Sequence, residues 1–188
     1  MDRGDHSGAA RDRPGWRLGD VGLSEVYLVG TSGGALAAIN AALEYPQLAR
    51  AVAADSFAGI SADPAVTKEI QAGRAQAKQI EGVRSYLQSI HGEDWEQVFD
   101  ADTDAVVRHA REIGAYFHRP LSELQVPLLL TGSEEDEMFP AGHYQRLFRE
   151  ICQETNRAEA HLFPHGGHPA MMSNMEEFSA LLDRLIEI

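Results

Sequence analysis

Ser32 stands in a sequence setting that can make its hydroxyl a nucleophile. The stretch 25–35 reads EVYLVGTSGGA, so a short apolar run leads directly into the pattern G-x-S-x-G. Gly30 and Gly34 permit a sharp turn between a strand and a helix, and such a turn exposes the serine hydroxyl. The N–H groups at the start of the helix then point to where negative charge develops in acyl transfer. The same pattern also occurs in purely structural turns, but the flanking strand and helix favour the catalytic interpretation.

A serine hydroxyl is a weak nucleophile unless a base takes its proton and a carboxylate orients that base. Asp136 and His168 follow Ser32 along the chain and can supply these groups. Each has a rival of the same residue type, because Asp55 is an alternative acid and His165 an alternative base. The chemistry that this set of residues predicts is acyl transfer through a serine.

Four short apolar runs alternate with helical patterns, and this alternation indicates how those side chains are positioned. The expected strands are residues 26–29, 50–54, 127–131 and 158–163, and the helices expected beside them are residues 35–45, 141–154 and 174–188. Such an order is typical of a mostly parallel sheet with crossover helices. We therefore expect an α/β fold.

All of the candidate residues are expected at one edge of this sheet. Ser32, Asp55 and Asp136 each follow one of the first three strands, and both candidate histidines follow the fourth. Ligands of parallel sheets bind at the carboxyl ends of the strands, where these residues would meet. The shared edge therefore strengthens the prediction of a catalytic site.

A long helical insert is expected between the second and third strands. Asp63 and Pro64 form a helix start, with an N-cap residue followed by a proline at the first helical position. Helical patterns then cover residues 65–90, 93–99 and 103–117.

Three segments resemble the catalytic blocks of the alpha/beta-hydrolase superfamily. They read VGTSGG at 29–34, LTGSEEDEMFP at 130–140 and FPHGGHP at 163–169. The resemblance covers about residues 22–188 and implies a serine hydrolase whose helical insert is a cap domain. The implied organisation is a poorly structured segment at 1–22, a core at 23–55 and 119–188, and a cap at 56–118.

The resemblance also implies a role for each site residue. Ser32 would be the nucleophile, His168 the general base and then the general acid, and Asp136 the orienting acid. The N–H of Gly33 would form half of the oxyanion hole. The family pattern places the catalytic histidine before a proline, which favours His168 over His165. We expect an ester or related small acyl substrate and no cofactor.

The alternatives remain open for the acid. Asp136 stands in the acidic run at 134–137, which a solvated loop would also explain, and some family members carry the acid at the position of Asp55. Five further histidines are expected on the surface or in the cap: His91, His109, His118, His143 and His161.

The chain departs from the family pattern before the nucleophile strand. No strand is recognised in residues 1–24, although the family carries strands there and a loop that supplies the second oxyanion donor. The strand at 26–29 would then be an exposed sheet edge, which favours self-association. The alternative function is accordingly a non-catalytic remnant or binding module.

The composition limits the kinds of partner that the chain is expected to bind. The chain has 188 residues and a net charge of −13, which opposes binding to nucleic acid or to anionic membranes. No apolar run is long enough to span a membrane, no secretion signal is recognised, and a cytoplasmic location is expected. No metal-ligand spacing is found. The single cysteine, Cys152, lies in an amphipathic helical run at 144–155 and is expected to be a buried thiol.

Overall fold

The computed structural model of the chain describes residue 23 and residues 25–187. The described residues divide into two compact units. One unit comprises the chain up to Phe57 and from Phe117 onward, and the other comprises Ala58–Tyr116. The segment at 1–22, which was expected to be poorly structured, lies outside the described residues.

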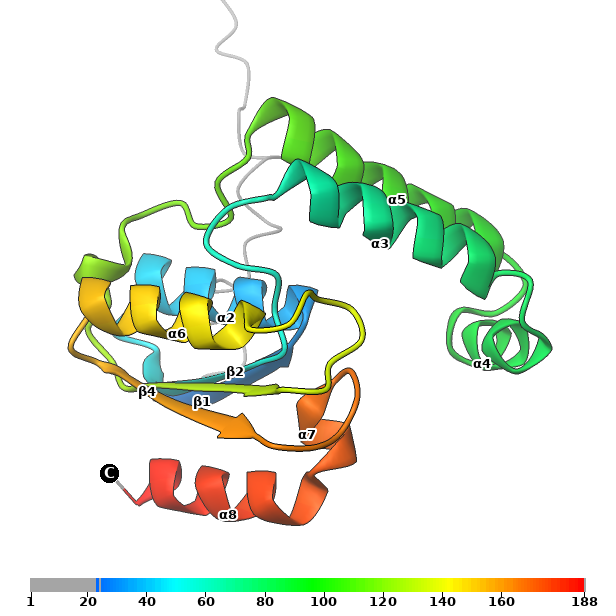
Figure 1. Cartoon of the computed structure of the whole chain (residues 1–188). Coiled ribbons are helices and arrows are strands. Elements are labelled where there is room, and N and C mark those ends of the chain that lie inside the picture. Colours follow the sequence, from blue (N-terminus) through cyan, green and yellow to red (C-terminus); the bar gives the residue numbers. More distant parts are fainter. Residues whose placement is uncertain (1–22, 24, 188) are drawn as a thin grey trace, which may run out of the picture. The chain divides into compact units, whose positions relative to one another are not determined.

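The first unit is built on a four-stranded parallel sheet, so the predicted α/β fold is confirmed. The strands lie side by side in the order in which they occur in the chain, as Figure 1 shows. They are β1 (Val26–Thr31), β2 (Ala49–Asp55), β3 (Leu128–Ser133) and β4 (Ala158–Phe163). All four carboxyl ends therefore meet at one edge of the sheet.

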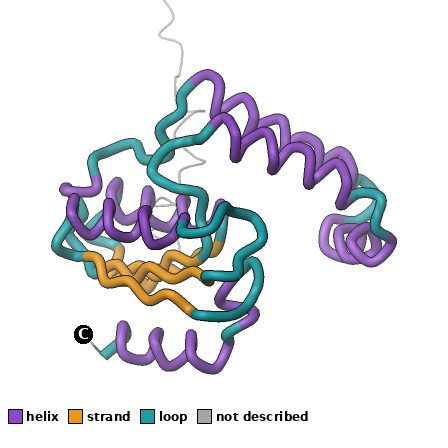
Figure 2. The backbone as a smooth tube through the Cα atoms, in the orientation of Figure 1, coloured by secondary structure: helices purple, strands orange, loops and turns teal. Residues whose placement is uncertain are grey.

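Helices cover both faces of the sheet (Figure 1). Helices α2 (Gly33–Glu44) and α6 (His143–Glu154) lie on one face, and α8 (Met175–Ile186) lies on the other. Two short elements complete this unit, the 3-10 helix η1 (Leu121–Glu123) and α7 (Ala170–Ser173), neither of which was predicted. Figure 2 shows the loops that connect the strands of the sheet to the helices on its two faces.

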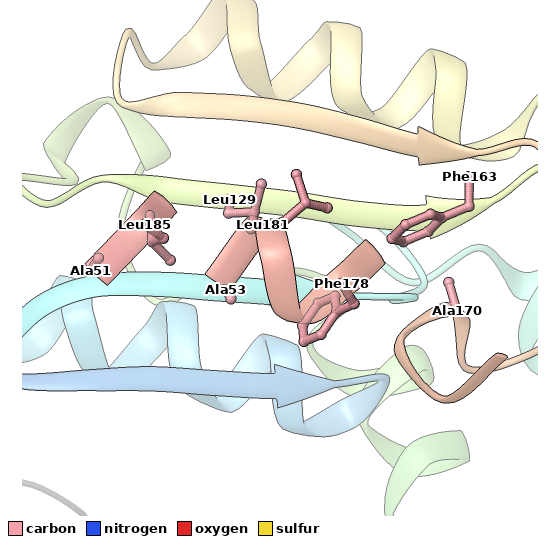
Figure 3. Close-up of a cluster of buried hydrophobic side chains, with 8 residues drawn as sticks. All are labelled: Ala51, Ala53, Leu129, Phe163, Ala170, Phe178, Leu181 and Leu185. Atoms are coloured by element: carbon pink, nitrogen blue, oxygen red, sulfur yellow. The ribbon is translucent and has the colours of Figure 1, made fainter. Parts of the chain in front are cut away.

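The core under α8 follows from the two-residue period of the strands. Ala51 and Ala53 of β2 face α8, and their small side chains let the helix approach the sheet closely. Phe178, Leu181 and Leu185 recur at helical spacing and fill the space against them (Figure 3). Asp55 lies two residues beyond Ala53, so its side chain continues on this same face, at the end of the strand.

Strand β1 lies at the edge of the sheet. Within the described part of the chain it pairs with β2 alone. Tyr27 and Val29 are 36% and 47% exposed, and none of the six residues of β1 carries a charge. Uncharged edge strands of this kind are templates for pairing with another strand.

The second unit consists of three helices: α3 (Pro64–Ala77), α4 (Glu81–His91) and α5 (Trp95–Glu112). Asp63 caps α3 as predicted, because its carboxylate accepts the N–H of Ala65 at 2.7 Å. The chain segments that enter and leave the unit are hydrogen-bonded to each other, from Tyr116 to Ile60 and from Ala62 to Gly114.

The helix boundaries in this unit differ from the sequence-based expectation. The helix expected over 65–90 is broken at residues 78–80, where neither proline nor glycine marks the turn. The two helices expected at 93–99 and 103–117 are one continuous helix, α5. Its acidic residues Glu96 and Asp100 do not end it; they pair with Lys78, the C-cap residue of α3.

Cys152 is exposed, so the expectation of a buried thiol is wrong. The buried stripe of α6 ends one residue earlier, at Ile151. No helix of the described residues is both long and apolar enough to cross a membrane. Within residues 23 and 25–187, no cluster of three or more His, Cys, Asp or Glu side chains is arranged to hold a metal ion.

Candidate active site

Ser32 sits on a strained turn between β1 and α2. Its φ of 53° is unusual for a residue other than glycine, and the backbone is fixed by a 2.8 Å hydrogen bond from the Ser32 N–H to the Asp55 carbonyl. A Cβ at Gly30 would overlap the carbonyl of Gly34, so only glycine fits at the end of the strand. A Cβ at Gly34 would meet no atom of the described chain within 4 Å, so the turn does not require glycine there, contrary to the expectation from the sequence.

Gly33 is the first residue of α2, and its backbone is exposed beside Ser32. The first N–H groups of a helix have no partner within the helix. The N–H of Gly33 is therefore free of intrahelical bonding and lies directly after the serine. A donor at this place can bind an oxyanion formed at the serine.

His168 and Asp136 are joined by a hydrogen bond between Nδ1 and Oδ2 of 2.9 Å. An ionised carboxylate only accepts, so Nδ1 carries the proton and Nε2 is left as an acceptor. The Asp136 side chain is 1% exposed and that of His168 is 15% exposed. The pair is thus shielded on the carboxylate side while the imidazole keeps access to solvent.

Asp136 is held by two further donors. The Tyr144 hydroxyl donates to Oδ2 at 2.6 Å, and the Met138 N–H donates to Oδ1 at 2.9 Å. Burial would raise the pKa of Asp136, but the hydrogen bonds from His168, Tyr144 and Met138 together hold it below its usual value. Asp136 is therefore ionised at neutral pH and able to orient a histidine and stabilise its charged form.

Tyr144 is a site residue that the sequence did not reveal. It belongs to the buried stripe of α6, and its ring packs so closely on Gly132 of β3 that a Cβ at that glycine would overlap the ring. Burial and the hydrogen bond to Asp136 raise the pKa of Tyr144, so its hydroxyl remains protonated and donates. Asp136 lies in the loop between β3 and α6, residues 134–142, which we call the acid loop. The sequence predicts that Tyr144 lies in the helix after this loop, but it does not predict the hydrogen bond to Asp136.

His143 also differs from expectation, because it packs against the acid loop rather than lying on the open surface. Its ring stacks on Phe139 with 4.4 Å between centroids, and Nε2 lies 3.3 Å from the Phe57 carbonyl. Burial lowers the pKa of His143, which favours the neutral form. Phe139 in turn meets the ring of His168 edge-on at 6.0 Å between centroids, so these rings support the acid loop.

The acidic run binds the histidine loop instead of being only solvated. Glu135 lies 3.2 Å from Nδ1 of His165 and also accepts the N–H of Gly166. Glu137 accepts the N–H of His168 at 3.2 Å. The structure thus pairs His165 with an exposed glutamate and pairs His168 with the buried Asp136.

Asp55, the alternative acid, makes no hydrogen bond or ion pair with a histidine side chain of the described chain. Its carboxylate is fully buried and accepts hydrogen bonds from the hydroxyls of Thr31 and Thr131 and from the N–H of Met171. The geometry therefore brings Asp136, and not Asp55, to His168.

The Ser32 hydroxyl and His168 are not hydrogen-bonded to each other in the described structure. Both belong to the carboxyl edge of the sheet, His168 through the loop that follows β4. Nucleophile and base often become aligned only when a substrate is bound, so the open arrangement is compatible with catalysis.

Comparison with known proteins identifies the family. The sequence profile of the alpha/beta hydrolase family matches residues 4–181. The chain belongs to the alpha/beta hydrolase family. No curated protein matches it by sequence search.

Solved structures of other alpha/beta hydrolases share the fold at low sequence identity. NosK from Streptomyces actuosus is 18% identical with a TM-score of 0.70, over 90% of this chain and 71% of that one. MGS-M2, an alpha/beta hydrolase from a Medee basin deep-sea metagenome, is 20% identical with a TM-score of 0.65, over 93% and 69%. 2-Hydroxy-6-oxo-6-phenylhexa-2,4-dienoate hydrolase from Rhodococcus sp. strain RHA1 is 16% identical with a TM-score of 0.63, over 91% and 67%. The chain thus spans about two thirds of the length of the proteins it matches.

Proposed function

We propose that this hydrolase is a serine hydrolase that cleaves an ester or a related small acyl compound through Ser32, His168 and Asp136. The observation that carries the proposal is the 2.9 Å bond between His168 and the buried Asp136, which leaves Nε2 of the histidine as the acceptor. The positive φ of Ser32 supports the assignment of this serine as the nucleophile.

The proposed reaction has two stages. Nε2 of His168 takes the hydroxyl proton as the Ser32 oxygen bonds to the acyl carbon, and the N–H of Gly33 stabilises the oxyanion. The histidine then gives its proton to the leaving alcohol, and an ester of Ser32 remains. Water, deprotonated by the same histidine, attacks this ester, and the histidine returns that proton to the Ser32 oxygen as the acyl–oxygen bond breaks, which releases the acid and regenerates the free serine. Asp136 stays ionised and stabilises the imidazolium in both stages.

The second unit is proposed to be the cap that determines which substrate is accepted. In Ala58–Tyr116, Val66 and Leu87 are the only hydrophobic side chains that are buried. Ile80, Tyr86 and Ile90 are each more than half exposed, so these helices offer apolar surface. An insert of this composition suits an acyl compound with apolar groups.

A panel of substrates tests which bond is cleaved, because one fold serves many reactions. The name of the Rhodococcus relative states a dienoate substrate, which is not an ester of an alcohol. A panel of p-nitrophenyl esters, a thioester and a 2-hydroxy-6-oxodienoate would separate these classes. Ester turnover is the expected result.

The test of the nucleophile is the turnover of the best ester by Ser32→Ala beside Ser179→Ala. Ser179 is an exposed serine of α8 whose hydroxyl binds the carbonyl of Met175, outside the proposed site. Loss of Ser32 should lower kcat by at least about 10³-fold, while the control should keep wild-type activity. A folded wild-type chain with no turnover of any compound would instead favour the non-catalytic binding module.

A further inference from the structure

We infer that Asp55 and Ser56 are positioning residues that anchor the loop carrying His168 to the strand end that carries Ser32. The inference rests on the proposed function, because it gives these two residues a part in assembling that same site. Neither residue takes part in the chemical steps proposed above.

The strand order separates Ser32 from His168 across the sheet. Ser32 follows β1 and His168 follows β4, and these strands lie at opposite ends of the order β1-β2-β3-β4. Neighbouring strands are about 4.8 Å apart, so the two strand ends are separated by roughly 14 Å across the sheet. The loop after β4 must therefore return across β3 towards β2 before His168 can serve Ser32.

Helix α7 is where this returning loop is fixed. It begins at Ala170, two residues after His168, and its N-cap residue Pro169 makes no side-chain cap. The first N–H groups of the helix consequently need other acceptors. The N–H of Ala170 donates to Ser56 Oγ at 2.8 Å, and the N–H of Met171 donates to Asp55 Oδ2 at 3.1 Å.

The same Asp55 carboxylate also binds both neighbouring strands. Thr31 Oγ1 donates to Oδ2 at 3.0 Å, and Thr131 Oγ1 donates to Oδ1 at 2.7 Å. Thr31, Asp55 and Thr131 are register partners in one row across the sheet. Thr31 directly precedes Ser32, so the carboxylate of Asp55 links the turn at Ser32, strand β3 and helix α7.

The burial of this carboxylate indicates that the links are specific. Asp55 is 0% exposed, and burying a charged group is unfavourable unless hydrogen bonds replace its water. Three donors meet it, and each comes from a different element. An apolar residue would fill this space without that cost, but it would leave the N–H of Met171 in α7 without its acceptor. The contacts therefore favour a role in alignment, where an error of about 1 Å costs about 100-fold in rate.

The test compares Ser56→Ala and Asp55→Asn with a matched control, Thr155→Ala. Thr155 is also buried, but its hydroxyl accepts the N–H of Arg157, before β4 at the amino end of the sheet. Asparagine keeps one oxygen for Thr31 and Met171, so Asp55→Asn is the conservative variant, and Asp55→Ala should have the largest effect of all. Steady-state kinetics, thermal melting and hydrogen exchange of the peptide 168–174 would be measured for each.

We expect Ser56→Ala to lower kcat by about tenfold or more with KM within about twofold, because alignment and not binding is impaired. Exchange in 168–174 should become faster, and Asp55→Asn should recover much of the activity that Asp55→Ala loses. The control should lower the melting temperature without changing kcat or this exchange.

Two results would overturn the inference. One is a wild-type kcat and wild-type exchange in 168–174 for both Ser56→Ala and Asp55→Asn. The other is an equal loss of kcat in Thr155→Ala at an equal loss of melting temperature, since that would reduce the effect to general stability. If the wild-type chain were inactive, the proposed function would fail. The exchange comparison would still decide whether Asp55 and Ser56 anchor α7.

Discussion

Tyr144 and His168 donate hydrogen bonds to the same oxygen of Asp136. The Tyr144 hydroxyl lies 2.6 Å and His168 Nδ1 lies 2.9 Å from Oδ2. One buried oxygen atom thus receives a neutral donor from α6 and the imidazole N–H from the loop after β4. The Tyr144 hydroxyl helps to keep the carboxylate ionised in a site where burial alone would favour its neutral form.

Removing the Tyr144 hydroxyl should weaken this arrangement without changing its shape. Tyr144→Phe deletes one hydrogen bond to a charged acceptor and should lower the free energy of unfolding by about 2 kcal/mol. The pKa of Asp136 should rise, because a group that favours its ionised form is lost. Urea denaturation would measure the first effect, with the exposed Tyr86→Phe as the control. Equal stability of the two variants would contradict the assignment.

Asp136→Asn should lower kcat by about 10³- to 10⁴-fold, because the amide no longer favours the required tautomer of His168. Glu134→Gln is the matched control, since Glu134 is in the same acidic run but binds the exposed Gln145. Initial rates with the best ester would measure both variants. If Asp136→Asn kept more than about a tenth of the activity, Asp136 would not be the orienting acid.

The stability of the chain should fall in acid because of Asp136. Its folded pKa is below that of the unfolded chain, which is about 3.9. Its contribution is therefore complete above that value and is lost as the pH falls through the folded pKa. The difference in unfolding free energy between wild type and Asp136→Asn should shrink between pH 5 and the folded pKa. A difference that grew as the pH fell would have the wrong sign for this carboxylate.

Gly30→Ala should damage the turn that holds Ser32, whereas Gly34→Ala should not destabilise the chain. The first change places a methyl group on the carbonyl of Gly34, and the second places it in open space. We expect Gly30→Ala to cost about 1–3 kcal/mol or more of stability. Gly34→Ala, within α2, should be neutral or slightly stabilising. Thermal melting of the two variants tests this, and equal melting temperatures would contradict the close approach.

The uncharged edge of β1 should cause self-association through strand pairing. Val29→Lys places a charge on this edge and should shift the chain towards the monomer in sedimentation experiments. Ile113→Lys is the control, because Ile113 is 69% exposed but lies in the second unit. A wild-type chain that is monomeric at high micromolar concentration would show that the edge does not associate.

The strands and the positions of the polar residues at their ends were predictable because both leave local signals. The apolar runs located all four strands, and the polar residues after them located Ser32, Asp136 and His168 at one edge. Gly30 indicated the sharp turn, since no other residue fits at this position. Asp63 and Pro64 predicted the start of α3, because an N-cap residue followed by proline is a local signal for a helix start.

What the sequence missed depends on contacts between distant segments. Tyr144 reads as an ordinary core residue until the fold brings its hydroxyl to Asp136. A solvated loop remained an alternative for the run 134–137, and only the fold shows that Glu135 and Glu137 bind the loop that carries His168. The pairing of α5 with the end of α3 likewise depends on Lys78, which lies between α3 and α4. Periodicity carries none of this information, because each contact is made only after folding.

The most direct test of the account is the site and rate of labelling by a fluorophosphonate, read by mass spectrometry of the intact chain and its peptides. The account predicts one adduct on Ser32, absent in Ser32→Ala and formed at least about 10²-fold more slowly in His168→Ala. Circular dichroism would establish that each variant is folded. A folded chain that forms no adduct, or one that carries it on a serine other than Ser32, would contradict the claim that His168 and Asp136 activate this residue.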